Sequence, residues 1–139
     1  MTRSLLVDTN VWGAQLNPRR EALWYRFARH LVDADPAIAM QTVAELRFGA
    51  LDAGWGPRRM AELEALLNRA VVIPVDDDVA WAHARLRTAC RLVGHPLHDK
   101  VHDGDLWIAA TAIAHDLPLV TDDGIFARVP GLQVIQEGS

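Results

Sequence analysis

Carboxylate side chains occur at four separated places that suit metal-assisted chemistry. Asp8 and Asp123 each follow a short apolar run, whereas Glu45 and Asp105 each lie at the start of a segment with helical periodicity. Carboxylates held within a few Å of one another repel unless protons or cations intervene. Oxygen ligands of this kind suit Mg²⁺ or Mn²⁺, which can bridge substrate phosphates and activate water as a nucleophile. Brought together, these residues could therefore hydrolyse a phosphodiester bond.

Helix capping explains several of these acids equally well when each is taken alone. Asp8 can cap a following helix, an interaction of about 0.5–2 kcal/mol. Thr42 and Glu45 match the Ser/Thr-x-x-Glu capping box. Asp105 lies where a helix dipole favours negative charge. Capping does not require carboxylates to converge, however, so their arrangement in the fold distinguishes the two interpretations.

The elements that would position these acids alternate along the chain. Short apolar runs predict buried strands at 5–7, 37–40, 71–75, 119–120 and 132–135. Helical patterns cover 19–33, 42–54, 57–70, 76–93 and 105–115, with a loop predicted at 94–104. This alternation predicts an α/β fold with a mainly parallel sheet of about five strands. Sites in such sheets form at the carboxyl ends of the strands.

Size and composition narrow the class of protein. The chain has 139 residues, which suits a single domain over 1–139, and its net charge is −4. A negative total argues against non-specific binding to nucleic acid, although it permits a site where metal meets phosphate. Cys90 is the only cysteine and is expected to be a buried small residue. No signal peptide or membrane-spanning run is expected, which predicts a soluble, cytoplasmic protein.

Other chemistries fit the sequence less well. A phosphate-binding Gly-x-x-x-x-Gly-Lys-Ser/Thr loop and a Gly-x-Ser-x-Gly elbow are both missing. The histidines at 95, 98 and 102 could form a zinc cluster, but a solvated loop explains them better. A Mg²⁺-dependent haloacid-dehalogenase-like phosphatase would need an acid where Asn10 stands. A receiver-type signalling module would need a lysine after a late strand, and Lys100 lies in the expected loop.

Four motifs in order resemble those of a known family. They are Leu-Leu-Val-Asp-Thr-Asn-Val at 5–11, Thr-Val-Ala-Glu-Leu-Arg-Phe-Gly-Ala at 42–50, Asp-Leu-Trp-Ile-Ala-Ala-Thr-Ala at 105–112 and Leu-Val-Thr-Asp-Asp at 119–123. Each motif alone is weak, but the set at these spacings is specific. The chain resembles PIN-domain ribonucleases, in particular VapC-type toxins of bacterial toxin–antitoxin pairs, from residue 4 to about 135.

The resemblance implies a PIN-like three-layer α/β/α sandwich and endonucleolytic cleavage of RNA (tRNA, rRNA or mRNA) dependent on Mg²⁺ or Mn²⁺. It assigns catalytic and metal-binding roles to Asp8, Glu45, Asp105 and Asp123. The family motif Thr-x-Asp or Thr-x-Asn selects Asp123 over the neighbouring Asp122. Supporting roles around the metal ligands fall on Asn10, Thr121 and Asp122.

The resemblance also implies a homodimer and a cognate antitoxin protein. An antitoxin of this kind would place a segment in a groove near the first helices. Aromatic side chains that could line this groove are Trp12, Trp24, Tyr25 and Phe27. A catalytically inactive PIN domain that acts only as a protein-binding module remains the alternative, although the presence of all four acids argues against it.

Overall fold

A central parallel sheet organises the protein, for which a computed structural model describes residues 3–137. Its strands are β1 (Arg3–Val7), β2 (Ala34–Ala39), β3 (Val71–Ile73), β4 (Leu119–Val120) and β5 (Val134–Ile135). The strand order is β3-β2-β1-β4-β5, and every neighbouring pair is parallel. The predicted α/β class and the five parallel strands are thus confirmed, and β1 lies in the middle of the sheet.

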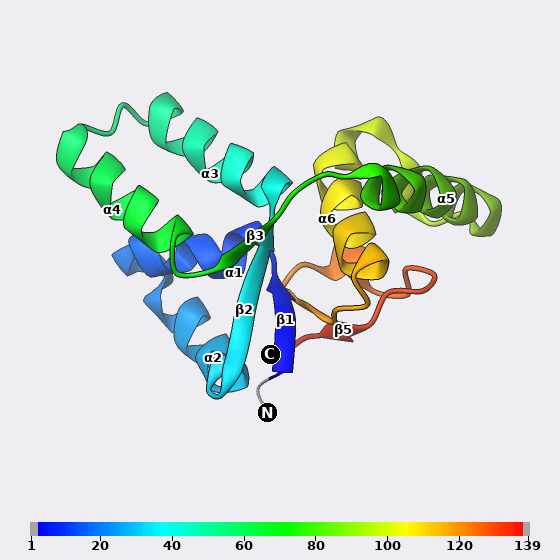
Figure 1. Ribbon diagram of the computed structural model, residues 1–139, viewed down its shortest axis with the longest axis horizontal. Helices are drawn as coiled ribbons and strands as arrows, with labels where there is room; N and C mark the ends of the chain where they lie inside the picture. Colours follow the sequence, from blue (N-terminus) through cyan, green and yellow to red (C-terminus); the bar gives the residue numbers. More distant parts are fainter. Residues whose placement is uncertain (1–2, 138–139) are drawn as a thin grey trace.

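Helices cover both faces of this sheet. They are α1 (Thr9–Gly13), α2 (Glu21–Leu31), α3 (Met40–Asp52), α4 (Pro57–Leu67), α5 (Asp77–Val93) and α6 (Asp103–Ala114). Helices α1 to α4 lie on one side of the sheet and α5 and α6 on the other (Figure 1). Within residues 3–137, no helix is both long enough and apolar enough to cross a lipid bilayer.

The alternation of side chains along β1 explains the three layers. Leu5 and Val7 belong to the core that α1 to α4 cover, whereas Leu6 belongs to the core beneath α5 and α6. All three side chains are fully buried. Because successive residues of a strand point to opposite faces, a continuous apolar run is what a strand buried on both faces requires.

The ends of several elements follow the predicted signals. Pro74 ends β3, and α5 ends at Gly94, whose φ of 75° is left-handed. The predicted loop at 94–104 is more ordered than expected, because it contains short 3-10 helices at Pro96–His98 and Lys100–His102. Helix α6 accordingly begins at Asp103, two residues before its predicted start.

The capping-box interpretation of Thr42 is wrong. Helix α3 begins at Met40, so Thr42 lies inside the first turn, and the N-cap residue Ala39 has no side-chain cap. The Thr42 hydroxyl instead lies 3.0 Å from the hydroxyl of Thr9. Thr42 is fully buried and therefore connects α3 to α1 rather than closing the end of its own helix.

Candidate functional site

The four predicted acids line one cavity of about 290 Å³ at the carboxyl edge of the sheet. They reach it from the end of β1, from α3, from the first turn of α6 and from the segment after β4. This cavity, called the acidic cavity below, is lined by Asp8, Thr9, Asn10, Glu45, Asp105, Ile108, Asp123 and Phe126. Parallel pairing of β1 with β4 brings residues from the two ends of the sequence together here.

Asp8 is both a helix cap and a member of the cavity. Its Oδ1 accepts a hydrogen bond from the backbone N–H of Val11 at 2.9 Å, which caps α1. Its Oδ2 accepts a hydrogen bond from the hydroxyl of Thr121. The capping and metal-binding interpretations are compatible at this residue, because one carboxylate has two oxygens and four lone-pair sites.

The negative charge of the Asp8 carboxylate is only partly stabilised by its surroundings. Burial raises its pKa from 3.8 to about 7, and the negative charges of Asp122 and Asp123 add to this rise. The hydrogen bonds from Thr121 and Val11 lower the pKa but do not offset the burial. Within residues 3–137, the Asp8 carboxylate forms hydrogen bonds with Val11 and Thr121 and no ion pair with a cationic side chain.

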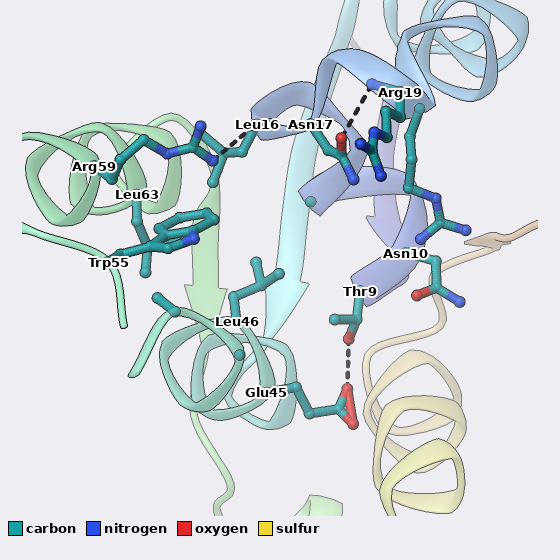
Figure 2. Close-up of a pocket in the computed structure, with 14 residues that line it drawn as sticks. Thr9, Asn10, Leu16, Asn17, Arg19, Glu45, Leu46, Trp55, Arg59 and Leu63 are labelled. Carbon is teal, nitrogen blue, oxygen red and sulfur yellow. Dashed lines mark hydrogen bonds between the residues drawn. The ribbon is translucent and has the colours of Figure 1, made fainter. Parts of the chain in front are cut away.

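Glu45 is held by side chains that the sequence analysis did not single out. The Thr9 hydroxyl donates a hydrogen bond to Oε1 at 2.6 Å, which Figure 2 shows, and Gln41 Nε2 donates to Oε2 at 3.3 Å. Gly104 of α6 lies against the same carboxylate, because a Cβ there would be 3.0 Å from both Glu45 Oε2 and Gln41 Nε2. Gln41 precedes Glu45 by four residues, a spacing that puts two side chains on the same helix face, so this contact could have been predicted from the sequence.

Asp105 lies in the first turn of α6, as predicted. Burial raises its pKa, and the charges of Asp123 and Glu45 raise it further. A hydrogen bond from His102, whose Nδ1 lies 3.3 Å from Oδ2 of Asp105, acts in the opposite direction. Asp105 thus shares the electrostatic environment of the other acids.

Asp123 rather than Asp122 faces the acidic cavity. Its Oδ1 accepts a hydrogen bond from the backbone N–H of Ile125 at 3.0 Å and so caps a short 3-10 helix, Gly124–Phe126. Its backbone N–H donates to Thr121 Oγ1, also at 3.0 Å. The buried Thr121 hydroxyl therefore links Asp8 to Asp123, whereas Asp122 is exposed and does not line the cavity.

The donor chemistry of the cavity fits a hard divalent cation. Its polar side chains are carboxylates, a hydroxyl and an amide, and its lining contains no Lys, Arg or His. Within residues 3–137, however, no three His, Cys, Asp or Glu side chains converge closely enough to form a complete ligand set. Mg²⁺ typically takes one or two protein carboxylates and keeps several waters, so the looser arrangement still suits it.

The histidines of the segment 94–104, for which a zinc cluster was the less favoured interpretation, each contact a different group. His95 contacts the carbonyl oxygen of Ala127 at 2.9 Å, His98 lies 3.5 Å from a carboxylate oxygen of Asp99, and His102 contacts Asp105. Each of these histidines therefore has a separate local partner.

The predicted aromatic groove needs correction. Trp12 and Phe27 are 3% and 0% exposed and belong to the core, so neither can line an open groove. The apolar faces of α1 and α2 turn these rings toward the sheet. Trp24 is half-buried, with its ring edge-on to Trp12 at 6.0 Å, and Tyr25 is 65% exposed.

Comparisons with known proteins agree with this geometry. The PIN-domain family model matches residues 5–132. Ribonuclease VapC5 of Mycobacterium tuberculosis is 38% identical over 134 residues, which cover 94% of this chain and 91% of that protein. A crystal structure of VapBC-5 from the same organism gives a TM-score of 0.66 at 33% identity, covering 96% of this chain and 98% of that chain. The DNA-bound VapBC of Salmonella typhimurium gives 0.80 at 25% identity, covering 98% of each chain. The chain therefore belongs to the PIN-domain family, where its relatives are VapC ribonucleases.

Proposed function

We propose that this protein is an endoribonuclease dependent on Mg²⁺ or Mn²⁺ and that it is the toxin of a toxin–antitoxin pair. The observation that carries the proposal is the acidic cavity. Four separate parts of the chain contribute a carboxylate to it, and none of the described residues that line it is basic. Its relatives with the name ribonuclease VapC support RNA as the substrate.

Each acid has a distinct part in this proposal. A bound divalent cation would neutralise phosphate charge and lower the pKa of a coordinated water. Asp8, fixed by Val11 and Thr121, and Asp105, in the first turn of α6, are the direct ligands. Glu45, oriented by Thr9 and Gln41, binds the ion or positions the attacking water.

The remaining polar residues support these ligands. Asp123 completes the ligand set, directly or through water, because the Thr121 hydroxyl keeps it beside Asp8. Asn10 is exposed at the mouth of the cavity, where its amide can contact the ribose or phosphate of the substrate.

Cleavage of a fluorescently labelled RNA in EDTA, Mg²⁺ or Mn²⁺ tests the proposal. Asp8→Asn and Asp105→Asn should each reduce the metal-dependent rate by about a hundredfold or more, equivalent to about 2.7 kcal/mol of transition-state stabilisation. Asp103→Asn is the matched control, because Asp103 is exposed in the same helical turn and contacts His83 instead of the cavity. The proposal is wrong if both cavity variants cleave RNA like the wild type.

A protein partner forms the second part of the proposal. The matched structures from Mycobacterium tuberculosis and Salmonella typhimurium are described as VapBC, the former as a toxin–antitoxin system. Of the predicted aromatic groove, Trp24 and Tyr25 remain accessible on α2. Tyr25→Glu should weaken capture of the antitoxin encoded beside this gene, whereas Arg87→Glu on α5 should not. If both variants capture the antitoxin equally well, α2 is not part of the antitoxin interface.

We further propose that the toxin is a cytoplasmic homodimer. Light scattering on the purified protein checks the oligomeric state, and a monomeric mass would contradict it. RNA cleavage and antitoxin capture together also separate the toxin from an inactive binding module, because such a module would retain capture but lack metal-dependent cleavage.

A further inference from the structure

A second cavity, of about 480 Å³, adjoins the acidic cavity and shares Thr9, Asn10 and Glu45 with it. It lies between α1 with the 3-10 turns that follow it and the hairpin of α3 and α4 (Figure 2). Its volume is within the range of sites for small ligands. This second cavity is called the arginine groove below; it is defined by Arg19, Arg20, Leu46, Trp55 and Arg59 together with the three shared residues.

One wall of the arginine groove carries positive charge that the protein does not neutralise. Arg19 and Arg20 are exposed, and within residues 3–137 neither forms a salt bridge. The side chain of Asn17 accepts a hydrogen bond from the backbone N–H of Arg19 at 3.0 Å, which fixes the turn that carries both arginines. Their guanidinium groups are therefore free to bind an anion, and this fork geometry matches phosphate.

The opposite wall consists of the apolar side chains of Trp55 and Leu46, and the guanidinium of Arg59 packs on the indole and holds it in place. The guanidinium of Arg59 lies 4.0 Å from the centre of the Trp55 ring and donates a hydrogen bond to the carbonyl oxygen of Leu16 at 3.0 Å. Leu46 continues this wall toward Glu45 (Figure 2). A wall of a half-buried indole and a leucine is suited to the flat, weakly polar face of a nucleobase.

We propose that the arginine groove binds the nucleotide adjacent to the scissile phosphate in single-stranded RNA. Its base packs against Trp55 and Leu46, and its backbone phosphate pairs with Arg19 and Arg20. This inference rests on the proposed function, because the shared residues Thr9, Asn10 and Glu45 make the groove continuous with the acidic cavity. A strand with its scissile phosphate at the carboxylates thus enters the groove directly.

The charge balance favours RNA as the occupant. The protein as a whole carries a net charge of −4, so its average field repels a polyanion. An unpaired arginine pair beside the carboxylates supplies local attraction at the place where the strand must pass. The aromatic wall requires an unstacked base, which single strands offer and duplexes do not.

Fluorescence anisotropy with a fluorescein-labelled single-stranded RNA of mixed sequence, in EDTA, tests the groove without cleavage. The double variant Arg19→Ala/Arg20→Ala should weaken binding about tenfold or more. It should also reduce the slope of log K against log salt by about 0.7, the value for one phosphate contact on a single strand. Trp55→Leu should weaken binding at least about fivefold and leave the salt slope unchanged, because base packing involves no counterion release.

The matched control is Arg87→Ala/Arg91→Ala, which removes the same charge from exposed positions of α5 on the opposite face of the sheet. It should change the affinity by no more than about twofold, within the usual range for surface substitutions. Equal losses in the two double variants would indicate general electrostatics and overturn the inference. Wild-type binding by Arg19→Ala/Arg20→Ala, or failure of the wild-type protein to bind, would overturn it as well.

Parallel cleavage assays in Mg²⁺ distinguish this inference from the proposed function. Metal-dependent cleavage with unchanged KM in Arg19→Ala/Arg20→Ala would leave the ribonuclease intact and reject the groove. Groove-dependent RNA binding without cleavage would reject the ribonuclease and retain the groove. If Arg19→Ala/Arg20→Ala binds RNA normally but no longer captures the antitoxin protein, the groove binds a protein partner instead and the inference is wrong.

Discussion

The acidic cavity and the arginine groove share one wall but differ in origin and energetic cost. The acidic cavity is built at strand ends and helix starts, and its Asp8 is almost fully buried. The groove is built from helix surfaces and turns, and its Arg19 and Arg20 remain in solvent. Burial of an uncompensated charge costs stability, whereas an exposed charge costs almost nothing.

This difference indicates which of the two sites depends on a ligand. Asp8 is the one buried carboxylate of the four, and a bound cation would offset the cost of its charge, so the proposed metal binding should be coupled to folding. The groove carries no comparable cost without a ligand, because its arginines are exposed to solvent. Substitutions in each site can test this contrast between a buried charge and exposed charges.

The largest expected effect is on stability without metal. Because the pKa of Asp8 is raised from 3.8 to about 7, the folded state binds an extra proton between these pH values, and stability falls as the pH rises through this window. At pH 8 the cost reaches up to roughly 4 kcal/mol. Asp8→Asn should therefore be more stable than the wild type at pH 8 and nearly equal at pH 4, by urea unfolding in EDTA.

Arg20→Gln, in the groove, is the control for this comparison and should follow the wild type at both pH values. A stability difference between Asp8→Asn and the wild type that stays constant with pH would contradict the electrostatic strain at Asp8.

Mn²⁺ or Mg²⁺ should raise the melting temperature of the wild type. A ligand present at a hundred times its Kd stabilises the folded state by about 2.7 kcal/mol. Asp8→Asn and Asp105→Asn should lose this shift, and Arg19→Ala/Arg20→Ala should keep it in full. Thermal unfolding with and without Mn²⁺ measures this rise in melting temperature. If the cavity variants show the same rise as the wild type, the ion binds at another place.

Gly104→Ala should reduce RNA cleavage about tenfold, equivalent to about 1.4 kcal/mol. The added methyl carbon would lie 3.0 Å from Glu45 Oε2, so the carboxylate must move. Gly56→Ala introduces the same methyl group at the start of α4, where nothing lies within 4 Å. Loss of activity in both variants would show that the contact at Glu45 is not the cause; RNA affinity in the groove should be unchanged in each.

The smallest effect is expected at the two neighbouring acids after β4. Asp122→Asn should alter the cleavage rate by no more than about twofold, because Asp122 is exposed and outside the cavity lining. Asp123→Ala should have the larger effect in the same assay. The reverse order would make Asp122 the fourth acid.

The parts of the fold that simple rules govern were predictable. Continuous apolar runs predict strands buried on both faces, and parallel pairing then directs Asp8 and Asp123 to one edge. The sequence alone could not decide whether the four acids cap helices or converge on one site. At Asp8 both are realised, because one oxygen caps α1 while the other contacts Thr121.

The predictions that were wrong concern side chains whose burial depends on tertiary packing. Local pattern could not show that Trp12 and Phe27 turn inward, since that depends on how α1 and α2 lie on the sheet. The arginine groove was not predicted because Arg19 and Trp55 are far apart in sequence and line the same cavity only after the chain has folded. Neither residue type carries a specific spacing signal.

The position of β4 has a consequence for synthesis of the protein. This strand is inserted between β1 and β5, and Thr121, which follows it, contacts Asp8 from 113 positions further along the chain. The carboxylate set is therefore incomplete until the chain has been synthesised through Asp123 and β4 has paired with β1. A chain that ends before β4 would keep Asp8, Glu45 and Asp105 but lack Thr121 and Asp123, and so would not form the complete acidic cavity.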